Sequence, residues 1–202
     1  MGFPTTWRGI ATISLACSLA VGLCSASQAS DIPRHLRGDG TVTLYNQSRN
    51  ERTQFKYRDE DGRYNEDAFE EISLFFRCRL TGENHDIDPK LIEILDAVED
   101  RFKSNEVKII SEYRSPERNA LMRKKGRRVA KRSLHMEGRA ADIEVPGVSK
   151  IALRNFAHSL KQGGVGSYKN RGFIHVDTGE VRTWGFAPGR PAARTRPATA
   201  HK

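Results

Sequence analysis

The chain has 202 residues, of which 37% are hydrophobic and 29% are charged, and its formal charge is +9 at pH 7. This length fits one domain with a usable core and leaves no need for a second domain. The positive charge favours polyanionic partners, and because no nucleic-acid motif is recognisable, nucleic acid is excluded as the expected partner.

The first 29 residues have the three parts of a secretory signal peptide. Arg8 supplies the positive charge, residues 9–23 form an uncharged apolar run, and Ser27-Gln28-Ala29 supplies the small residues before a cleavage site. The run is too short for a transmembrane helix, so we expect export to the periplasm without stable membrane insertion after signal cleavage. A lipoprotein acylated at Cys24 is the less favoured alternative, because Leu23 stands where a small residue is needed.

Cleavage would leave one domain over residues 30–184 and a basic tail over residues 185–202 that lacks periodicity and is expected to be disordered. Two of the three cysteines lie in the signal, so the exported chain keeps Cys78 alone and has no internal disulfide. Such a domain relies on its core or on a metal for stability. We interpret Cys78 as a small buried hydrophobe within a helix.

The first half of the domain predicts a β-hairpin and two helices. Apolar residues alternate over residues 41–45 and 54–57, which predicts the hairpin. Helical spacing of apolar residues, including Leu80 as the last, predicts a helix over residues 66–80 with its aromatic side chains in the core. Asp88-Pro89 predicts the start of a second helix, with Asp88 as its N-cap.

The second half predicts further strands and two more helices. Helices are expected to begin at Ser115-Pro116 and to run over residues 149–162, where Gly163-Gly164 is interpreted as the stop. The basic run over residues 123–132 is interpreted as a solvated loop, with binding of an anionic polymer as the alternative. The expected strands cover residues 106–111, 140–145, 165–168, 173–177 and 181–184, of which the third and fourth pair.

A histidine and an aspartate, His135 and Asp142, lie seven positions apart around Gly138. Two ligands of one ion must lie within about 2 Å of it, so the chain has to reverse between them, and Gly138 can adopt the positive φ that a reversal needs. Alone, this pair is better explained by a solvated histidine and a capping aspartate. His175 changes that balance, because it offers a third ligand from a separate strand.

Three ligands of this type predict one zinc ion per chain with its fourth position open, which is typical of catalytic zinc. Zinc lowers the pKa of a coordinated water to about 7 and polarises a carbonyl, so the expected chemistry is hydrolysis of an amide.

The general base is less constrained by the sequence. Asp177 is the first candidate, because residues two apart on a strand face the same side and His175 is one of them. An aspartate that only orients a histidine ligand explains Asp177 equally well. Glu137 is the second candidate, and an exposed loop charge is its alternative.

Two residues are candidates for contact with the substrate. Arg114 can hold a substrate carboxylate or a developing oxyanion through its guanidinium, and a structural salt bridge is its alternative. Tyr168 can donate to an oxyanion, although packing on a strand explains it better.

Several ordered motifs between residues 41 and 184 together resemble the YcbK-like murein endopeptidases. This family lies within the zinc superfamily of D-alanyl-D-alanine peptidases, lysostaphin-type enzymes and hedgehog domains. The motifs are Ser111-Glu112-Tyr113-Arg114-Ser115, the segment from Ser133 to Asp142, Gly163-Gly164-Val165-Gly166, Phe173-Ile174-His175-Val176-Asp177-Thr178-Gly179 and Arg182-Thr183-Trp184. Leu44-Tyr45-Asn46 and Asp86-Ile87-Asp88-Pro89-Lys90-Leu91 also fit the N-terminal half of the family. The resemblance implies an α+β domain in which a small antiparallel sheet, flanked by helices, carries a zinc site.

By position, the resemblance implies His135, Asp142 and His175 as metal ligands and Arg114 as the arginine that binds a substrate carboxylate. Glu112 departs from the family, in which a glycine is usual before the Tyr-Arg pair. Residues 167–171 also depart from the Tyr-Pro sequence that is usual in the family at this position.

The resemblance also implies hydrolysis of peptide bonds in peptidoglycan, either as a cross-link endopeptidase or as a D-amino-acid carboxypeptidase. The function expected from the sequence is therefore a periplasmic zinc peptidase that contributes to cell-wall remodelling. A non-catalytic module that is stabilised by zinc and binds the cell wall is the alternative.

Overall fold

The structure, a computed structural model, describes residues 32–127 and 129–185. The expected signal peptide, and the expected tail from residue 186 onward, lie outside the described residues. Within the described ranges, no helix has the length and apolar character needed to cross a bilayer.

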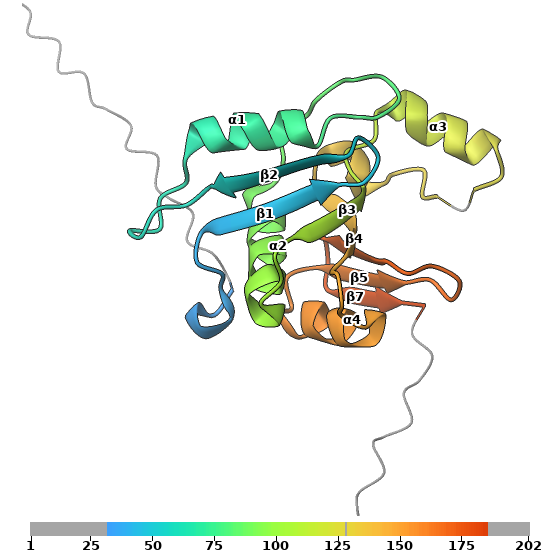
Figure 1. Cartoon of the computed structure of the whole chain (residues 1–202). Coiled ribbons are helices and arrows are strands. Elements are labelled where there is room, and N and C mark those ends of the chain that lie inside the picture. The colour runs from blue at the N-terminus through green and yellow to red at the C-terminus, as the bar shows by residue number, and fades with distance from the viewer. Residues whose placement is uncertain (1–31, 128, 186–202) are drawn as a thin grey trace, which may run out of the picture.

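Seven strands form one sheet in the order β2-β1-β3-β4-β6-β5-β7 (Figure 1). The strands are β1 (Thr41–Asn46), β2 (Glu51–Lys56), β3 (Val107–Ser111), β4 (Ala140–Glu144), β5 (Gly164–Ser167), β6 (Ile174–Asp177) and β7 (Arg182–Trp184). The helices are α1 (Glu66–Phe75), α2 (Pro89–Phe102), α3 (Pro116–Lys124) and α4 (Lys150–Ser159), with the short 3-10 helices η1 (Arg34–Leu36) and η2 (Leu134–Glu137).

The α+β class is confirmed, but the expectation of a small antiparallel sheet is wrong. The sheet is larger and mixed, because β1 pairs with β3 in parallel and β5 pairs with β7 in parallel. The chain between β1 and β3 runs through β2 and then through α1 and α2, so it is long enough for the crossover that parallel neighbours need. The pairing of β5 with β7 is parallel because both strands run antiparallel to β6, and β7 lies on the far side of β5 from β6.

The helices begin where the local chemistry predicts. Asp88 accepts a hydrogen bond from Lys90 N–H with Pro89 in the first turn of α2, and Ser115 caps α3 in the same way ahead of Pro116. These side chains satisfy backbone donors that have no partner inside the helix. The expected starts of both helices are therefore confirmed.

The end of the first helix differs from the expectation. Helix α1 ends at Phe75, and the chain turns through Gly82, which has a φ of 75°. Leu80 therefore lies outside the helix and is 47% exposed. Cys78 is buried as expected, but it lies in this turn, where its Sγ is 3.5 Å from the Oγ of Ser115.

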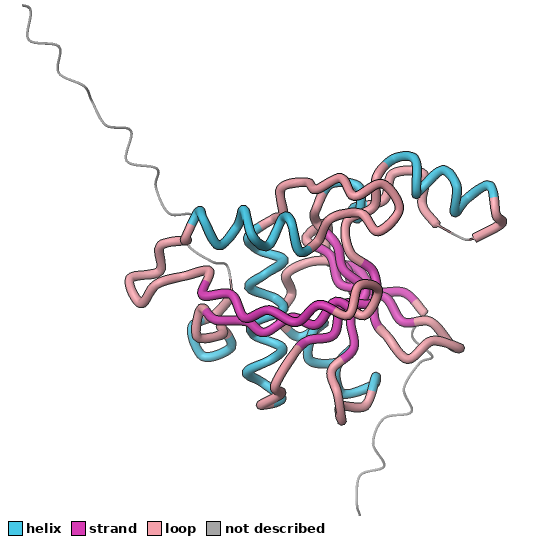
Figure 2. The backbone as a smooth tube through the Cα atoms, turned by 45° about the horizontal axis from the view of Figure 1, so that its top comes forward, coloured by secondary structure: helices cyan, strands magenta, loops and turns pink. Residues whose placement is uncertain are grey.

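The helices pack on the sheet to form the core, with α2 against β1 and α4 against β5; Figure 2 shows the strands as a twisted layer with helical segments around it. The aromatic residues Phe75 and Phe76 are buried, as expected for core positions. The largest fully buried side chains include Tyr57, Phe76, Leu44, Ile72, Leu91, Ile92, Leu95, Ile109, Ile143, Leu153 and Ile174.

Asp96 is one of the buried carboxylates of α2 and is completely buried. Its Oδ2 accepts hydrogen bonds from the Tyr57 hydroxyl at 2.7 Å and from Gly40 N–H at 2.9 Å. Its Oδ1 has no hydrogen-bond partner among the described residues. Burial raises the pKa of Asp96 to about 7.

Candidate metal centre and active site

The chain reverses between His135 and Asp142 as the sequence predicts. Gly138 ends η2 with a φ of 64°, a conformation that strains residues with a Cβ. The backbone also passes so close to another loop that a Cβ on Gly138 would lie 1.9 Å from the carbonyl oxygen of Asp86. Gly138 is thus required both for the turn and for the close approach.

The site is built along one row of side chains that crosses the sheet. Asp142 on β4 is paired with Ser111 on β3 and with His175 on β6, and His175 is paired with Gly166 on β5. Residues directly opposite one another on neighbouring strands project from the same face of the sheet. Strand pairing therefore places Asp142 beside His175.

The third member, His135, comes from η2 and completes a buried group of side chains that could hold a metal ion. Its Nε2 is 3.2 Å from His175 Nδ1 and 3.5 Å from Asp142 Oδ1, and the latter two atoms are 3.0 Å apart. All three side chains are buried. The structure thus brings together the three residues that the sequence singled out.

Each histidine is held through its other ring nitrogen. His135 Nδ1 lies 3.0 Å from the carbonyl oxygen of Glu112, to which it donates, and His175 Nε2 lies 3.0 Å from Asp177 Oδ2. These bonds leave His135 Nε2 and His175 Nδ1 as the two nitrogens that face Asp142.

The electrostatics differ between the two rings. Burial, together with the charge of Arg114, lowers the pKa of His135 to about 4, so this ring is neutral at neutral pH. Burial opposes protonation of His175 as well, but hydrogen bonds to Asp142 and Asp177 raise its pKa above the ordinary value. The histidines and their hydrogen bonds hold the pKa of Asp142 well below its usual range, against the effect of burial.

This donor set fits a zinc ion. Ligand atoms about 2.0–2.1 Å from a tetrahedral zinc lie about 3.3 Å from one another, which matches the triangle formed by the three donor atoms. Asp39, Asp96 and Asp100 form a second acidic group within the described ranges, but two of these three residues are exposed. The group of His135, Asp142 and His175 is the better candidate, because it is buried and includes imidazole.

Arg114 lies against the other oxygen of Asp142. Its Nη2 donates to Asp142 Oδ2 at 3.1 Å and to Ser111 Oγ at 3.1 Å, and the guanidinium is buried. Asp142 therefore presents Oδ1 to the histidines while Oδ2 is held by Arg114. The structural salt bridge considered for Arg114 is present, and its Nη1 makes no hydrogen bond to any described residue.

Asp177 lies on the far side of His175 from Asp142. Its two oxygens accept hydrogen bonds from His175, from the backbone of Gly164 and Gly179, and from Arg182. Burial opposes ionisation, but the bonds from His175 and from the two backbone amides hold the pKa of Asp177 well below its usual range. This geometry favours the interpretation of Asp177 as a residue that orients a histidine.

Glu137 and Tyr168 occupy different positions relative to the site. Glu137 is exposed, and its carboxylate lies 3.3 Å from Arg139. Tyr168 is 38% exposed and lies close enough to Asp142 for the carboxylate, after burial, to raise the pKa of the phenol. Tyr168 therefore lies at the margin of the site, whereas Glu137 faces solvent.

Trp184 belongs to one of the motifs that carry the family resemblance, but it was not predicted as a site residue, and it is a neighbour of the site. Its ring lies 5.1 Å from the His175 ring, although β5 separates β7 from β6. The contact is possible because Gly166 stands between them, where a Cβ would lie 2.3 Å from the indole. Gly164 does the same for Arg182, which reaches across β5 to Asp177 at 2.8 Å.

Gly164 and Gly166 clear one face of β5 so that two side chains of β7 reach β6. A glycine inside a strand is a signal of such a close approach. That signal, read with the aromatic residue of the final strand, would have pointed to Trp184. The expected helix over residues 149–162 with Gly163-Gly164 as its stop is wrong at its end, because α4 ends at Ser159 and Gly164 already belongs to β5.

Glu112, which stands where the resembled family usually has glycine, is completely buried. Its Oε1 accepts a hydrogen bond from Arg118 Nη1 at 2.7 Å. The backbone near Glu112 is hydrogen-bonded to η2, because Arg114 N–H donates to the carbonyl oxygen of His135 at 2.9 Å. The glutamate is thus accommodated by an ion pair beneath the site.

Comparison with known proteins agrees with these features. The family model described as Peptidase_M15_2, peptidoglycan L,D-endopeptidase MepK, matches residues 35–184. A probable peptidoglycan L,D-endopeptidase MepK of Haemophilus influenzae is 32% identical over 180 residues, which cover 88% of this chain and 93% of that protein. The peptidoglycan L,D-endopeptidase MepK of Escherichia coli K12 is 36% identical over 126 residues, which cover 61% of this chain and 69% of that protein. No solved structure matches this chain.

Proposed function

The chain belongs to the Peptidase_M15_2 family of MepK-type peptidoglycan L,D-endopeptidases, and from this membership we propose that it is a zinc-dependent peptidase that cuts peptide bonds in peptidoglycan. The names of its relatives favour an L,D-endopeptidase over a carboxypeptidase. The observation that carries the proposal is the buried triangle of two histidine nitrogens and one aspartate oxygen, with each histidine fixed from behind.

In this proposal, His135 Nε2, His175 Nδ1 and Asp142 Oδ1 hold one zinc ion per chain. When bound, zinc would supply Lewis acidity, which polarises a peptide carbonyl and lowers the pKa of water so that hydroxide is available as the nucleophile at neutral pH. Arg114 keeps Asp142 in place through Nη2 and offers Nη1 to the substrate, either to a carboxylate or to the developing oxyanion.

Tyr168 and Asp177 have separate tasks. Burial and the charge of Asp142 raise the pKa of Tyr168, so its hydroxyl keeps its proton at neutral pH and can donate a hydrogen bond to an oxyanion. Asp177 orients His175 and keeps the proton on Nε2, because its oxygens are already engaged and its low pKa makes it a weak base. Glu137 pairs with Arg139, and it has no hydrogen bond or ion pair with any of the three proposed ligands, all of which lie among the described residues.

The proposed setting is the periplasm, with peptidoglycan as the partner. A signal peptide over residues 1–29 would direct export, and residues 30–184 would form the peptidase domain. Acylation at Cys24 remains the less favoured arrangement.

Purified zinc-loaded protein should release products from isolated sacculi that separate as cleaved cross-linked muropeptides by liquid chromatography. His135→Ala should lose this activity, and metal analysis should give about one zinc per wild-type chain and much less in the variant. Binding of sacculi by the wild type without any zinc-dependent cleavage would overturn the proposal in favour of a cell-wall-binding module.

A further inference from the structure

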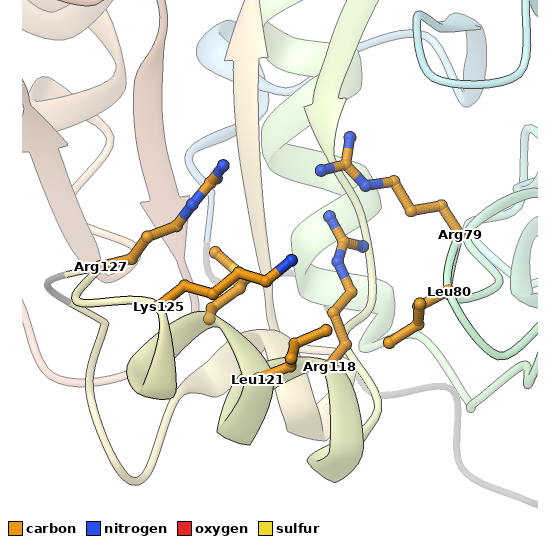
Figure 3. A pocket seen from close by; sticks show the side chains of 7 residues that line it. Arg79, Leu80, Arg118, Leu121, Lys125 and Arg127 are labelled. Carbon is orange, nitrogen blue, oxygen red and sulfur yellow. The ribbon is translucent and has the colours of Figure 1, made fainter.

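A pocket of about 240 Å³ lies between the turn that follows α1 and the helix α3. Four of its lining residues are cationic: Arg79, Arg118, Lys125 and Arg127. Figure 3 shows the guanidinium of Arg79 beside that of Arg118, with the amino group of Lys125 directed into the same space. Positive groups from two separate segments therefore line one concave surface.

Most of this charge is not balanced by nearby carboxylates. Arg118 pairs with Glu112 at 2.7 Å, whereas Arg79, Lys125 and Arg127 have no ion pair with any described residue. Burial is the largest cause that lowers the pKa of Arg79, and the charges of Arg118 and Arg127 lower it further, whereas the charge of Glu112 opposes them. An anion in the pocket would relieve this repulsion.

The remaining lining residues are apolar: Leu80, Leu121 and Met122. Leu80 is 47% exposed and Leu121 is 37% exposed, but both face the pocket, so they are placed to contact a discrete ligand. A phosphate group alone would leave this apolar surface uncovered. A peptide that carries carboxylates together with small apolar side chains matches both parts of the lining.

The pocket adjoins the candidate metal centre through one buried residue. Glu112 holds Arg118 with its side chain and accepts from His135 with its backbone carbonyl. A ligand in the pocket would therefore lie beside the site, on the α3 side. Peptidoglycan is a polymer in which each peptide that is cut has neighbouring peptides with free carboxylates.

We propose that this pocket, lined by Arg79, Arg118, Lys125 and Arg127, binds a carboxylate-bearing stem peptide of peptidoglycan next to the peptide that is cut. The inference rests on the proposed function for the identity of the polymer. Of the basic run over residues 123–132, which was expected to be a loop, Arg123 and Lys124 belong to the last turn of α3. The proposal assigns Lys125 and Arg127 of this run to substrate binding, the alternative to a solvated loop.

The test compares two double variants that remove the same charge from the same segment. Lys125→Ala/Arg127→Ala removes two cations that line the pocket, whereas Arg123→Ala/Lys124→Ala removes two exposed neighbours that do not. Arg118 is left intact, because its loss would disturb Glu112 beneath the metal centre. The probe is a purified disaccharide tripeptide, which contains free carboxylates and no cross-link, and binding to the zinc-loaded protein is measured by calorimetry.

The pocket variant should bind this probe about tenfold more weakly than the wild type, while the matched variant should bind it normally. Amidation of the probe carboxylates should weaken binding to the wild type by a similar factor. Equal binding by the two double variants would overturn the inference. Competition would also overturn it. Inorganic phosphate or phosphatidylglycerol vesicles would then abolish binding of the probe at concentrations at which free acetate has no effect.

Hydrolysis of sacculi by the same proteins separates this inference from the proposed function. If the wild type cuts sacculi and the two double variants match it in both binding and KM, the pocket assignment fails and the peptidase stands. If the wild type binds the probe through the pocket and never cuts sacculi, the peptidase proposal fails and the binding site stands.

Discussion

Asp177 Oδ2 lies 3.0 Å from His175 Nε2, on the side of the ring opposite to Asp142. Asp177→Asn keeps the shape of this contact but removes the negative charge that also pairs with Arg182. Removal of a carboxylate behind a histidine ligand lowers metal affinity by about 10- to 100-fold. We therefore expect weaker zinc binding in competition with a chelator, and substantial recovery of hydrolysis when zinc is in excess.

The same variant tests the alternative role of Asp177. A general base that is changed to an amide would leave zinc affinity nearly unchanged and would abolish turnover even at saturating zinc. Glu137→Gln, measured beside it, should leave both zinc affinity and turnover as in the wild type, because Glu137 is exposed and pairs with Arg139.

The open face of β5 gives a second prediction. A Cβ at Gly166 would lie 2.3 Å from the Trp184 indole, so Gly166→Ala should displace the ring from His175 and destabilise the protein by about 1–3 kcal/mol. Trp184→Ala removes the obstructing ring. A double-mutant cycle should therefore be non-additive, with Gly166→Ala costing little in the Trp184→Ala background. Urea unfolding and hydrolysis of sacculi measure the two effects, and additive losses would show that the clash is absent.

The buried Asp96 predicts how stability changes with pH. Its pKa is raised from 3.8 to about 7 in the folded protein, so its contribution to stability is fully present below pH 3.8 and is lost as the pH rises to about 7. Asp96→Asn should remove this dependence. Both proteins are compared in a His135→Ala background, where metal binding does not contribute. The unfolding free energy of the Asn variant relative to that of its parent should rise by a few kcal/mol between pH 5 and pH 8. The exposed Glu70→Gln serves as control, and parallel pH curves for the Asn variant and its parent would contradict the assignment.

The ion pair beneath the site gives a fourth prediction. Arg118→Met leaves the carboxylate of Glu112 buried without its partner and should cost about 3–5 kcal/mol of unfolding free energy. Glu112→Gln/Arg118→Met removes both charges and should recover most of that loss in urea unfolding. Equal destabilisation in the single and double variants would mean that packing, and not the unpaired charge, sets the cost.

The sequence predicted the features of the fold that depend on neighbouring residues, namely helix starts and a chain reversal. The caps Asp88 and Ser115 marked the starts of two helices, and Gly138 marked the reversal, because each acts on neighbouring backbone. The end of α1 was missed, since apolar spacing continues to Leu80 although the chain has already turned.

Contacts that depend on the order of the strands in the sheet could not be predicted from local sequence patterns. The parallel pairing of β1 with β3 and the contact between Trp184 and His175 both depend on which strands become neighbours. Alternation correctly placed Asp177 on the same face as His175, but only the ring geometry shows that it lies behind the histidine. The hold of Arg114 on the second oxygen of Asp142 likewise joins residues far apart in the chain.

The pairing of Asp142 with His175 also has a consequence for the proposed zinc site. These two donors lie on different strands and become neighbours only when β4 and β6 zip together, so the unfolded polypeptide has no complete site. Zinc would then bind the folded form selectively. The free energy of unfolding would rise with the logarithm of the ratio of free zinc concentration to the dissociation constant. If zinc binds as proposed, a complete set of ligands would require the assembled sheet, and the availability of zinc in the compartment would change the stability of the folded form.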